Sequence, residues 1–167
     1  DSFSEGLRLG VEVYHALKLL LRERGLDVGL GDEGGFAPDL PSSEDAIEAI
    51  LEAAERAGHL ERVAIALDPA TSEIYEGGVY RFEGREATGE KLTDYWAELL
   101  ERFPLVSIED GAAEEDWAAW KAHTDRIFCE ARRAGRREPR AAYAADALVA
   151  LAGEGPCKPV EVRVTVD

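Results

Sequence analysis

Apolar side chains recur at helical spacing in two segments of the N-terminal part of the chain. The first predicts an amphipathic helix over 4–24, and Gly25 is a fitting stop signal. The second predicts a helix that starts at Ser42, since Ser42 and Asp45 have capping-box spacing, and that ends at Gly58. The apolar faces consist of Leu7, Val11, Tyr14, Leu17 and Leu21 in the first helix, and of Ile47, Ile50, Leu51 and Ala54 in the second.

A third helix and the start of a fourth are predicted further along the chain. Thr88 can cap the third helix, and Pro104 ends it. Trp117 and Trp120 mark the fourth helix. The apolar face of the third helix is formed by Leu92, Tyr95, Trp96, Leu99 and Phe103.

Short apolar runs between these helices predict strands. Residues 63–67 and 105–108 have the continuous apolar pattern of strands that are buried on both faces of a parallel sheet. Two further strand-like segments, 74–75 and 79–82, flank Glu76-Gly77-Gly78, which indicates a hairpin. Because strands alternate with helices, we expect an α/β fold built from right-handed β/α units around a parallel sheet.

The composition is that of a globular protein and excludes two classes of partner. The chain has 167 residues, of which 46% are hydrophobic and 32% charged, and no apolar run approaches the ~20 residues that a membrane span needs. The net charge of −16 argues against nucleic acid and against an anionic membrane surface. Cys129 and Cys157 form neither a disulfide framework nor a zinc set, so we expect reduced thiols and a cytoplasmic protein.

Charge is distributed unevenly, which predicts a domain boundary. Residues 1–127 hold 12 Lys and Arg against 29 Asp and Glu, a net of −17. Residues 128–167 hold 7 against 6, a net of +1. In this tail we expect an Ala-rich helix over about 141–152 and then a half-exposed strand. Its arginines are expected to form a solvated helix face.

Two acidic residues follow the two predicted buried strands. Asp68 and Glu109 each stand at a strand's C-terminal end, where barrels and open α/β sheets build their active sites. A pair of carboxylates in such a place suits Mg²⁺. The alternative is that each carboxylate caps the next helix or pairs with an arginine, and spacing alone does not decide between the two.

A third acid, Glu33, lies in a glycine-rich loop. Glycines let the backbone approach a ligand closely, so this carboxyl could act as a general acid if desolvation raised its pKa. The alternative is an exposed acid in a turn. The loop lacks the Gly-Lys-Ser/Thr ending of a phosphate loop. His15, His59 and His123 form no recognisable ligand set, so structural roles are expected for them.

Four blocks of sequence carry a family pattern. They are residues 2–14, then Gly31-Asp32-Glu33-Gly34-Gly35-Phe36-Ala37-Pro38, then 66–75, then Val106-Ser107-Ile108-Glu109-Asp110 with the acidic run to Trp117. In order and spacing, these blocks resemble the catalytic barrel domain of the enolases over about residues 1–127. The resemblance implies a partial enolase-type TIM (β/α) barrel, followed by a short helix–strand tail over 128–167.

The resemblance also implies an activity and a role for each acid. Enolases are Mg²⁺-dependent lyases of glycolysis that remove water from 2-phosphoglycerate. They are typically dimers, but much of the family's dimer contact has no counterpart in this sequence, so a homo-oligomer and a monomer both remain open. Glu33 matches the family's general acid, which helps the hydroxyl leave. Asp68 and Glu109 match two metal-binding carboxylates, and Glu109 also lies beside the substrate in the family. The Mg²⁺ ions neutralise the charge that develops on the substrate carboxylate when a lysine removes a proton.

The chain departs from the family pattern after about residue 127. The third metal-binding aspartate, expected after Arg126-Ile127, has no match, nor does the catalytic lysine, because Lys18, Lys91 and Lys121 lie on predicted helices. Gly111-Ala112 stands where the family usually has Pro-Phe, and Asp68-Pro69-Ala70-Thr71 differs slightly from the usual run.

The tail over 128–167 is similar to an actinobacterial domain of unknown function that often precedes an HNH nuclease module. Such a hybrid could be a gene fusion, a frameshift or a misassembled reading frame. Three hypotheses therefore remain: an enolase or part of one, a catalytically inactive truncated or fused remnant, and a nuclease-associated module.

Overall fold

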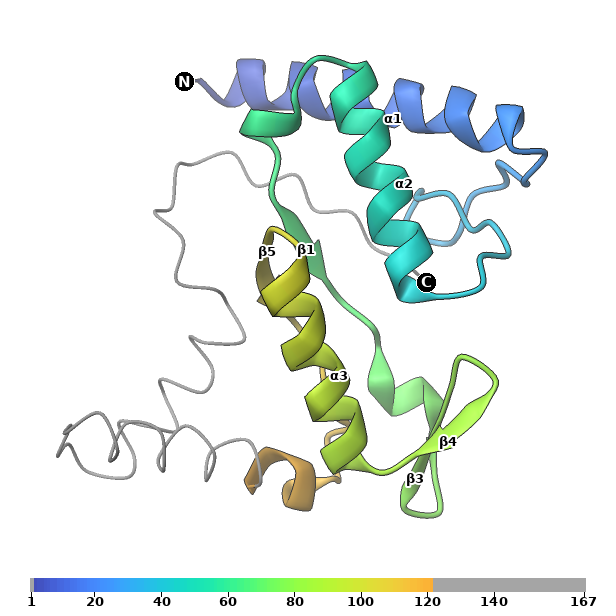
Figure 1. Ribbon diagram of the computed structural model, residues 1–167, viewed down its shortest axis with the longest axis vertical. Coiled ribbons are helices and arrows are strands. Elements are labelled where there is room, and N and C mark those ends of the chain that lie inside the picture. Colours follow the sequence, from blue (N-terminus) through green and yellow to red (C-terminus); the bar gives the residue numbers. More distant parts are fainter. Residues whose placement is uncertain (1, 122–167) are drawn as a thin grey trace, which may run out of the picture. The chain divides into compact units, whose positions relative to one another are not determined.

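The computed structural model describes residues 2–121, which belong to two compact units (Figure 1). The first unit takes in the described residues up to Leu67, and the second begins at Asp68. The predicted tail over 128–167, with its helix and strand, lies outside the described residues.

The first unit is built on two helices that pack against each other. Helix α1 spans Phe3–Glu23, and helix α2 spans Ser43–Arg56. The short 3-10 helix η1 (Leu60–Arg62) and the strand β1 (Ile65–Leu67) follow. All three residues of β1 are buried, as expected for this apolar run. The strand is shorter than the predicted 63–67.

The predicted ends of both helices are confirmed. The Ser42 hydroxyl accepts a hydrogen bond from the Asp45 amide at 3.1 Å and donates to the Asp45 carboxylate, so Ser42 is the N-cap of α2, as predicted. Gly25 and Gly58 have backbone φ angles of 73° and 75°, a left-handed conformation that ends a helix most readily at glycine.

The predicted apolar face of α1 is only partly right. Leu17 and Leu21 are buried as predicted, but Leu7 and Val11 are 59% and 47% exposed, and the rest of the buried stripe lies to one side of the predicted face. That stripe consists of Leu9, Val13, Leu17, Leu20 and Leu21. Both stripes have helical spacing, so periodicity alone does not distinguish them, and the face that meets α2 is decided by packing.

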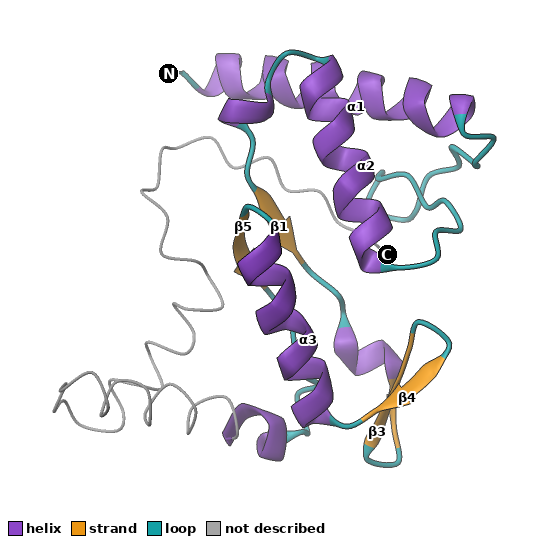
Figure 2. Cartoon of the chain, viewed as in Figure 1, coloured by secondary structure: helices purple, strands orange, loops and turns teal. Residues whose placement is uncertain are grey.

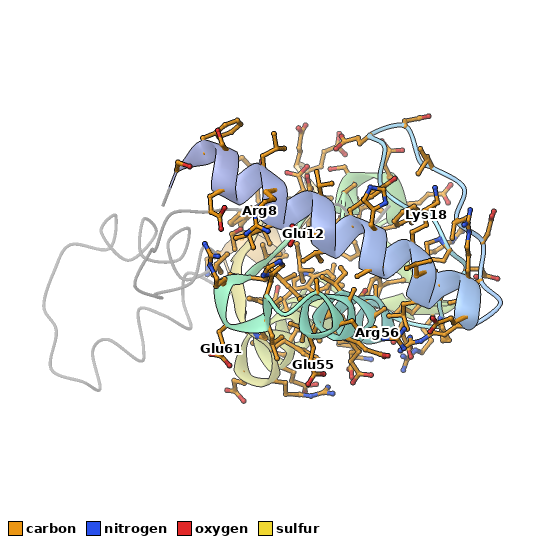
Figure 3. The ribbon with its side chains drawn as sticks, turned by 90° about the horizontal axis from the view of Figure 1, so that it is seen from above. Arg8, Glu12, Lys18, Glu55, Arg56 and Glu61 are labelled. Carbon is orange, nitrogen blue, oxygen red and sulfur yellow. The ribbon has the colours of Figure 1, made fainter. Side chains whose placement is uncertain are left out.

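A chain of ion pairs crosses the surface between α1 and η1. Glu5 lies between Arg62 and Arg8, and Glu12 lies between Arg8 and His59; Figure 3 labels Arg8 and Glu12, one turn apart on α1. The hydrogen bonds from Arg8 and then Arg62 lower the pKa of Glu5 to about 2. His59 thus has the structural role expected for it, although exposed pairs of this kind stabilise a fold only slightly.

The second unit contains a three-stranded antiparallel sheet (Figure 2). The strands are β2 (Tyr75–Glu76), β3 (Val79–Phe82) and β4 (Arg85–Ala87), preceded by the 3-10 helix η2 (Thr71–Ile74). Tyr75 pairs with Tyr80, and Tyr80 pairs with Ala87. The hairpin around Gly77-Gly78 was predicted, but the third strand was not.

A helix and a strand complete the described part of the second unit. Helix α3 spans Gly89–Arg102, with Thr88 as its N-cap, and it contacts β3, β4 and the strand β5 (Leu105–Ile108). Leu92, Trp96 and Leu99 form its buried face, as predicted. The fourth helix begins at Trp117 and continues to the last described residue. The described strands form no closed barrel.

Candidate functional site

Two acidic loops of the second unit carry the predicted metal ligands. Asp68 directly follows β1, and Glu109 directly follows β5, as the sequence predicted. The Asp68 side chain is half-buried, and that of Glu109 is exposed. Both residues are therefore accessible from solvent, one at the end of the buried strand β1 and the other at the end of the partly buried strand β5.

A buried threonine ties the two loops together. Thr71, which is 0% exposed, lies three residues after Asp68. Its amide nitrogen is 3.3 Å and its hydroxyl oxygen 2.5 Å from the carbonyl oxygen of Asp110, the residue after Glu109. The backbone segments that carry Asp68 and Glu109 are therefore held side by side.

Each of these loops makes an unusual backbone bend at the tie. Ala70 and Asp110 have φ angles of 43° and 48°, in the left-handed region that non-glycine residues rarely occupy. Such conformations persist where the surrounding contacts determine them, and they gather at functional sites. Here the contacts are those of Thr71, which follows Ala70 and bonds Asp110.

The loop after β5 is also held from α3. The buried indole of Trp96 donates to the Gly111 carbonyl oxygen at 2.8 Å. A Cβ on Gly111 would meet Ile108 Cγ2 at 3.2 Å, so the loop runs close to the core at this point. Two consecutive carbonyls after Glu109, those of Asp110 and Gly111, are thus bonded by side chains from different elements.

A second buried network fixes the continuation of this loop. The Tyr80 hydroxyl donates to Asp116 Oδ2 at 2.9 Å and accepts from the Ala113 amide at 3.0 Å. Asp116 also accepts from the Ala119 amide at 3.0 Å. Burial raises the pKa of Tyr80 to about 12, and the neighbouring Asp116 adds to the shift. The network joins β3 to the start of the fourth helix.

Glu33 lies in the first unit, at a turn of the loop that follows α1. The turn is closed by hydrogen bonds from the Gly31 amide to the Gly35 carbonyl at 2.9 Å and from the Gly34 amide to the Gly31 carbonyl at 3.0 Å. Its base packs on α1, where the Tyr14 ring stacks on Phe36 with centroids 4.3 Å apart. The Glu33 side chain is exposed.

The donor chemistry of the two acidic loops suits a hard divalent cation. Mg²⁺ is commonly bound through one or two carboxylates, with waters and substrate oxygens in the other positions, and the tied loops supply two carboxylates. Within residues 2–121, no group of three His, Cys, Asp or Glu side chains could hold a metal ion. Two carboxylates fit a weak, water-completed Mg²⁺ site better than a closed protein cage.

Comparison with known families identifies the fold to which these loops belong. Residues 1–131 match the family model described as the enolase C-terminal TIM barrel domain. The chain belongs to the enolase family. Its fold is thus of the α/β TIM-barrel type, and the enolase resemblance of the four sequence blocks is confirmed.

Membership of the family makes this an enolase-type lyase domain. No helix in the described part of the chain is long and apolar enough to cross a membrane. The roles of Glu33, Asp68 and Glu109 and the boundary at residue 127 stay predictions. Sequence reasoning missed Thr71 and Trp96, which hold the acidic loops; a threonine three residues after the strand-end aspartate was the only local signal for the first of them.

Proposed function

We propose that this chain supplies the metal-and-acid side of the enolase reaction, the Mg²⁺-dependent dehydration of 2-phosphoglycerate to phosphoenolpyruvate in glycolysis. The observation that carries the proposal is the hydrogen-bonded pairing of the loops after Asp68 and Glu109. Family membership supports it, because Asp68 and Glu109 both lie within the matched residues 1–131. The proposed substrate is a small phosphorylated hydroxy acid, with no nucleic acid or membrane partner.

Each acid has a separate task in the proposed reaction. Asp68 and Glu109 would hold Mg²⁺, which when bound neutralises charge that develops on the substrate carboxylate. Glu33 would give its proton to the leaving hydroxyl after a base has taken the proton from the neighbouring carbon, so that the electron pair of that C–H bond forms the double bond as the carbon–oxygen bond breaks and water departs. Rigid loops help, because ligands already in place need no reorganisation during the reaction.

The proposed reaction also needs a base, and the described lysines do not provide one. Lys18 and Lys91 lie on α1 and α3, and Lys121 lies in the fourth helix. None follows a described strand, where a barrel enzyme places its catalytic groups. We therefore propose that residues 2–121 supply only part of an enolase site.

A coupled assay for phosphoenolpyruvate tests this reading. We expect no turnover of 2-phosphoglycerate by the isolated chain at saturating Mg²⁺, but measurable Mn²⁺ binding by electron paramagnetic resonance. The Asp68→Asn/Glu109→Gln double variant should lose that binding. Turnover by the chain alone would contradict the incomplete-site reading.

The second candidate is a non-catalytic remnant of the family. It is favoured by the absence, within residues 2–121, of a three-residue metal-binding group. A remnant that has lost the metal site and binds only a partner would bind Mn²⁺ no better than the double variant does. The same titration therefore separates the two candidates without relying on activity.

A further inference from the structure

We propose that Thr71 is a positioning residue that holds the Glu109 loop against the Asp68 loop and so sets the spacing at which the two carboxylates bind a cation. The inference rests on the proposed function, because it needs Asp68 and Glu109 to be cation ligands. It adds a residue that neither touches the cation nor carries charge.

The geometry of the tie supports this role. Both donors of Thr71, its amide and its hydroxyl, point to one acceptor, the Asp110 carbonyl oxygen. A carbonyl oxygen has two lone pairs and can accept both bonds. Since Asp110 is bonded directly to Glu109, a shift of this carbonyl moves the backbone that carries the carboxylate.

Burial makes the tie stronger than a surface contact. Thr71 is 0% exposed, so no water reaches its hydroxyl where it lies, and a loss of the Asp110 carbonyl at that position would leave a buried donor without a partner. A second link between the same segments, from the Glu114 amide to the Ser72 hydroxyl, is longer at 3.4 Å and exposed. Thr71 is therefore the stronger of these two side-chain links.

The backbone bends beside the tie give a further reason. Ala70 and Asp110 are both left-handed, and both adjoin the Thr71–Asp110 bonds. Without the Thr71 hydroxyl, one of the hydrogen bonds that hold Ala70 and Asp110 in the left-handed conformation is lost. The backbone of each loop can then relax toward negative φ values. The distance between the two carboxylates would then vary, and a small hard cation tolerates such variation poorly.

The test uses the full chain, with Mn²⁺ as the probe and free Mn²⁺ measured by electron paramagnetic resonance. Thr71→Val removes the hydroxyl at nearly constant shape, and Thr71→Ser keeps it. Thr93→Val is the matched control: Thr93 is also buried and its hydroxyl donates to the Gly89 carbonyl at 2.8 Å, but it lies within α3.

We expect Thr71→Val to weaken Mn²⁺ binding by roughly tenfold, as is typical when a group behind a metal ligand is removed. Thr71→Ser should bind within about twofold of the unaltered chain, because its hydroxyl can make the same bond. Thr93→Val should bind Mn²⁺ like the unaltered chain even if it is less stable. Equal affinity of Thr71→Val and the unaltered chain would overturn the inference and leave the proposed function standing.

Two further outcomes complete the test. If the unaltered chain binds Mn²⁺ no better than Asp68→Asn/Glu109→Gln, the proposed function fails, and this inference fails with it. If Thr71→Val does not fold, amide hydrogen exchange of the unaltered chain decides. Saturating Mg²⁺ should then slow exchange at Thr71 and leave Thr93 unchanged, whereas an unchanged rate at Thr71 would overturn the inference.

Discussion

Ala70 has a left-handed backbone conformation, which glycine adopts readily and alanine rarely does. Its φ of 43° places it among three left-handed non-glycine residues in the described chain, with Glu83 and Asp110. An alanine in this region costs roughly 1–2 kcal/mol relative to a right-handed conformation. The strain is local, so a single substitution can measure it.

We expect Ala70→Gly to raise the free energy of unfolding slightly, by about 0.5 kcal/mol. Glycine relieves the strain, but it also gives the unfolded chain about 0.4–1 kcal/mol of extra conformational freedom. Ala97→Gly in α3 is the control, because there the same change should destabilise by about 0.5–1 kcal/mol. Urea unfolding measures both. Equal destabilisation by the two variants would show that Ala70 is not strained.

Tyr80 gives the fold a dependence on alkaline pH. Its pKa rises from 10.0 to about 12 on folding, mainly because it is buried. Between these values the unfolded chain loses this proton and the folded chain keeps it, so stability falls as pH rises. Below pH 10 the phenol is neutral in both states and the effect is absent.

We expect the free energy of unfolding to fall by about 2–3 kcal/mol more in the unaltered chain than in Tyr80→Phe between pH 10 and 12. Urea unfolding at several pH values gives the difference. Tyr95→Phe is the control, since Tyr95 is half-buried and donates to Glu83 at 3.1 Å. Parallel pH curves for the unaltered chain and Tyr80→Phe would disprove the coupling.

Elements with strong local signals were predicted well. The N-cap at Ser42, the hairpin at Gly77-Gly78 and the strand at 105–108 all formed where the sequence placed them, since each depends on neighbouring residues. Strand β4 was missed because two of its three residues, Arg85 and Glu86, are exposed and charged, which hides any strand pattern. The buried stripe of α1 depended on its partner helix and so was not readable locally.

Helix α3 begins where there is no room for a side chain. A Cβ on Gly89 would lie 2.4 Å from Asp116 Oδ2 and 2.6 Å from Ala119 Cβ. Close packing at this helix start thus joins α3 to the buried Tyr80–Asp116 network.

We expect Gly89→Ala to destabilise the protein by about 1–3 kcal/mol, as is usual when a packed site is overfilled. Helix propensity alone predicts the opposite sign, a gain of up to about 1 kcal/mol. Glu90→Ala is the control: Glu90 lies in the same first turn but is exposed, so its replacement should change the free energy of unfolding by less than about 0.5 kcal/mol. Chemical unfolding of both variants compares the two effects. A Gly89→Ala variant at least as stable as the unaltered chain would mean that Asp116 and Ala119 move away from the added methyl group at little cost in free energy.

The positions of Asp68 and Glu109 at strand ends were predictable, because each follows a short apolar run, which is a local pattern. Their roles as metal ligands stay predictions, and the residues that hold their loops were not predictable. The tie from Thr71 joins residues 39 positions apart, so only the folded chain reveals it. The enolase family pattern was readable because it is spread over four blocks in a fixed order.

The negative charge of the whole chain predicts that it does not bind nucleic acid. With a net charge of −16, the protein should show no salt-dependent binding to duplex DNA at low ionic strength. Fluorescence anisotropy of a labelled duplex at about 50 mM salt tests this. Binding that weakens as salt is added would support the nuclease-associated hypothesis suggested by the tail.

The indole of Trp96 offers an optical view of the Glu109 loop. Its N–H is bonded to the Gly111 carbonyl in a buried setting, whereas Trp117 is 77% exposed and Trp120 is half-buried. Replacing Trp117 and Trp120 with phenylalanine would leave one fluorophore, whose emission should lie at short wavelengths. Any red shift of that emission would then report, in real time, that water has reached the backbone two residues from Glu109.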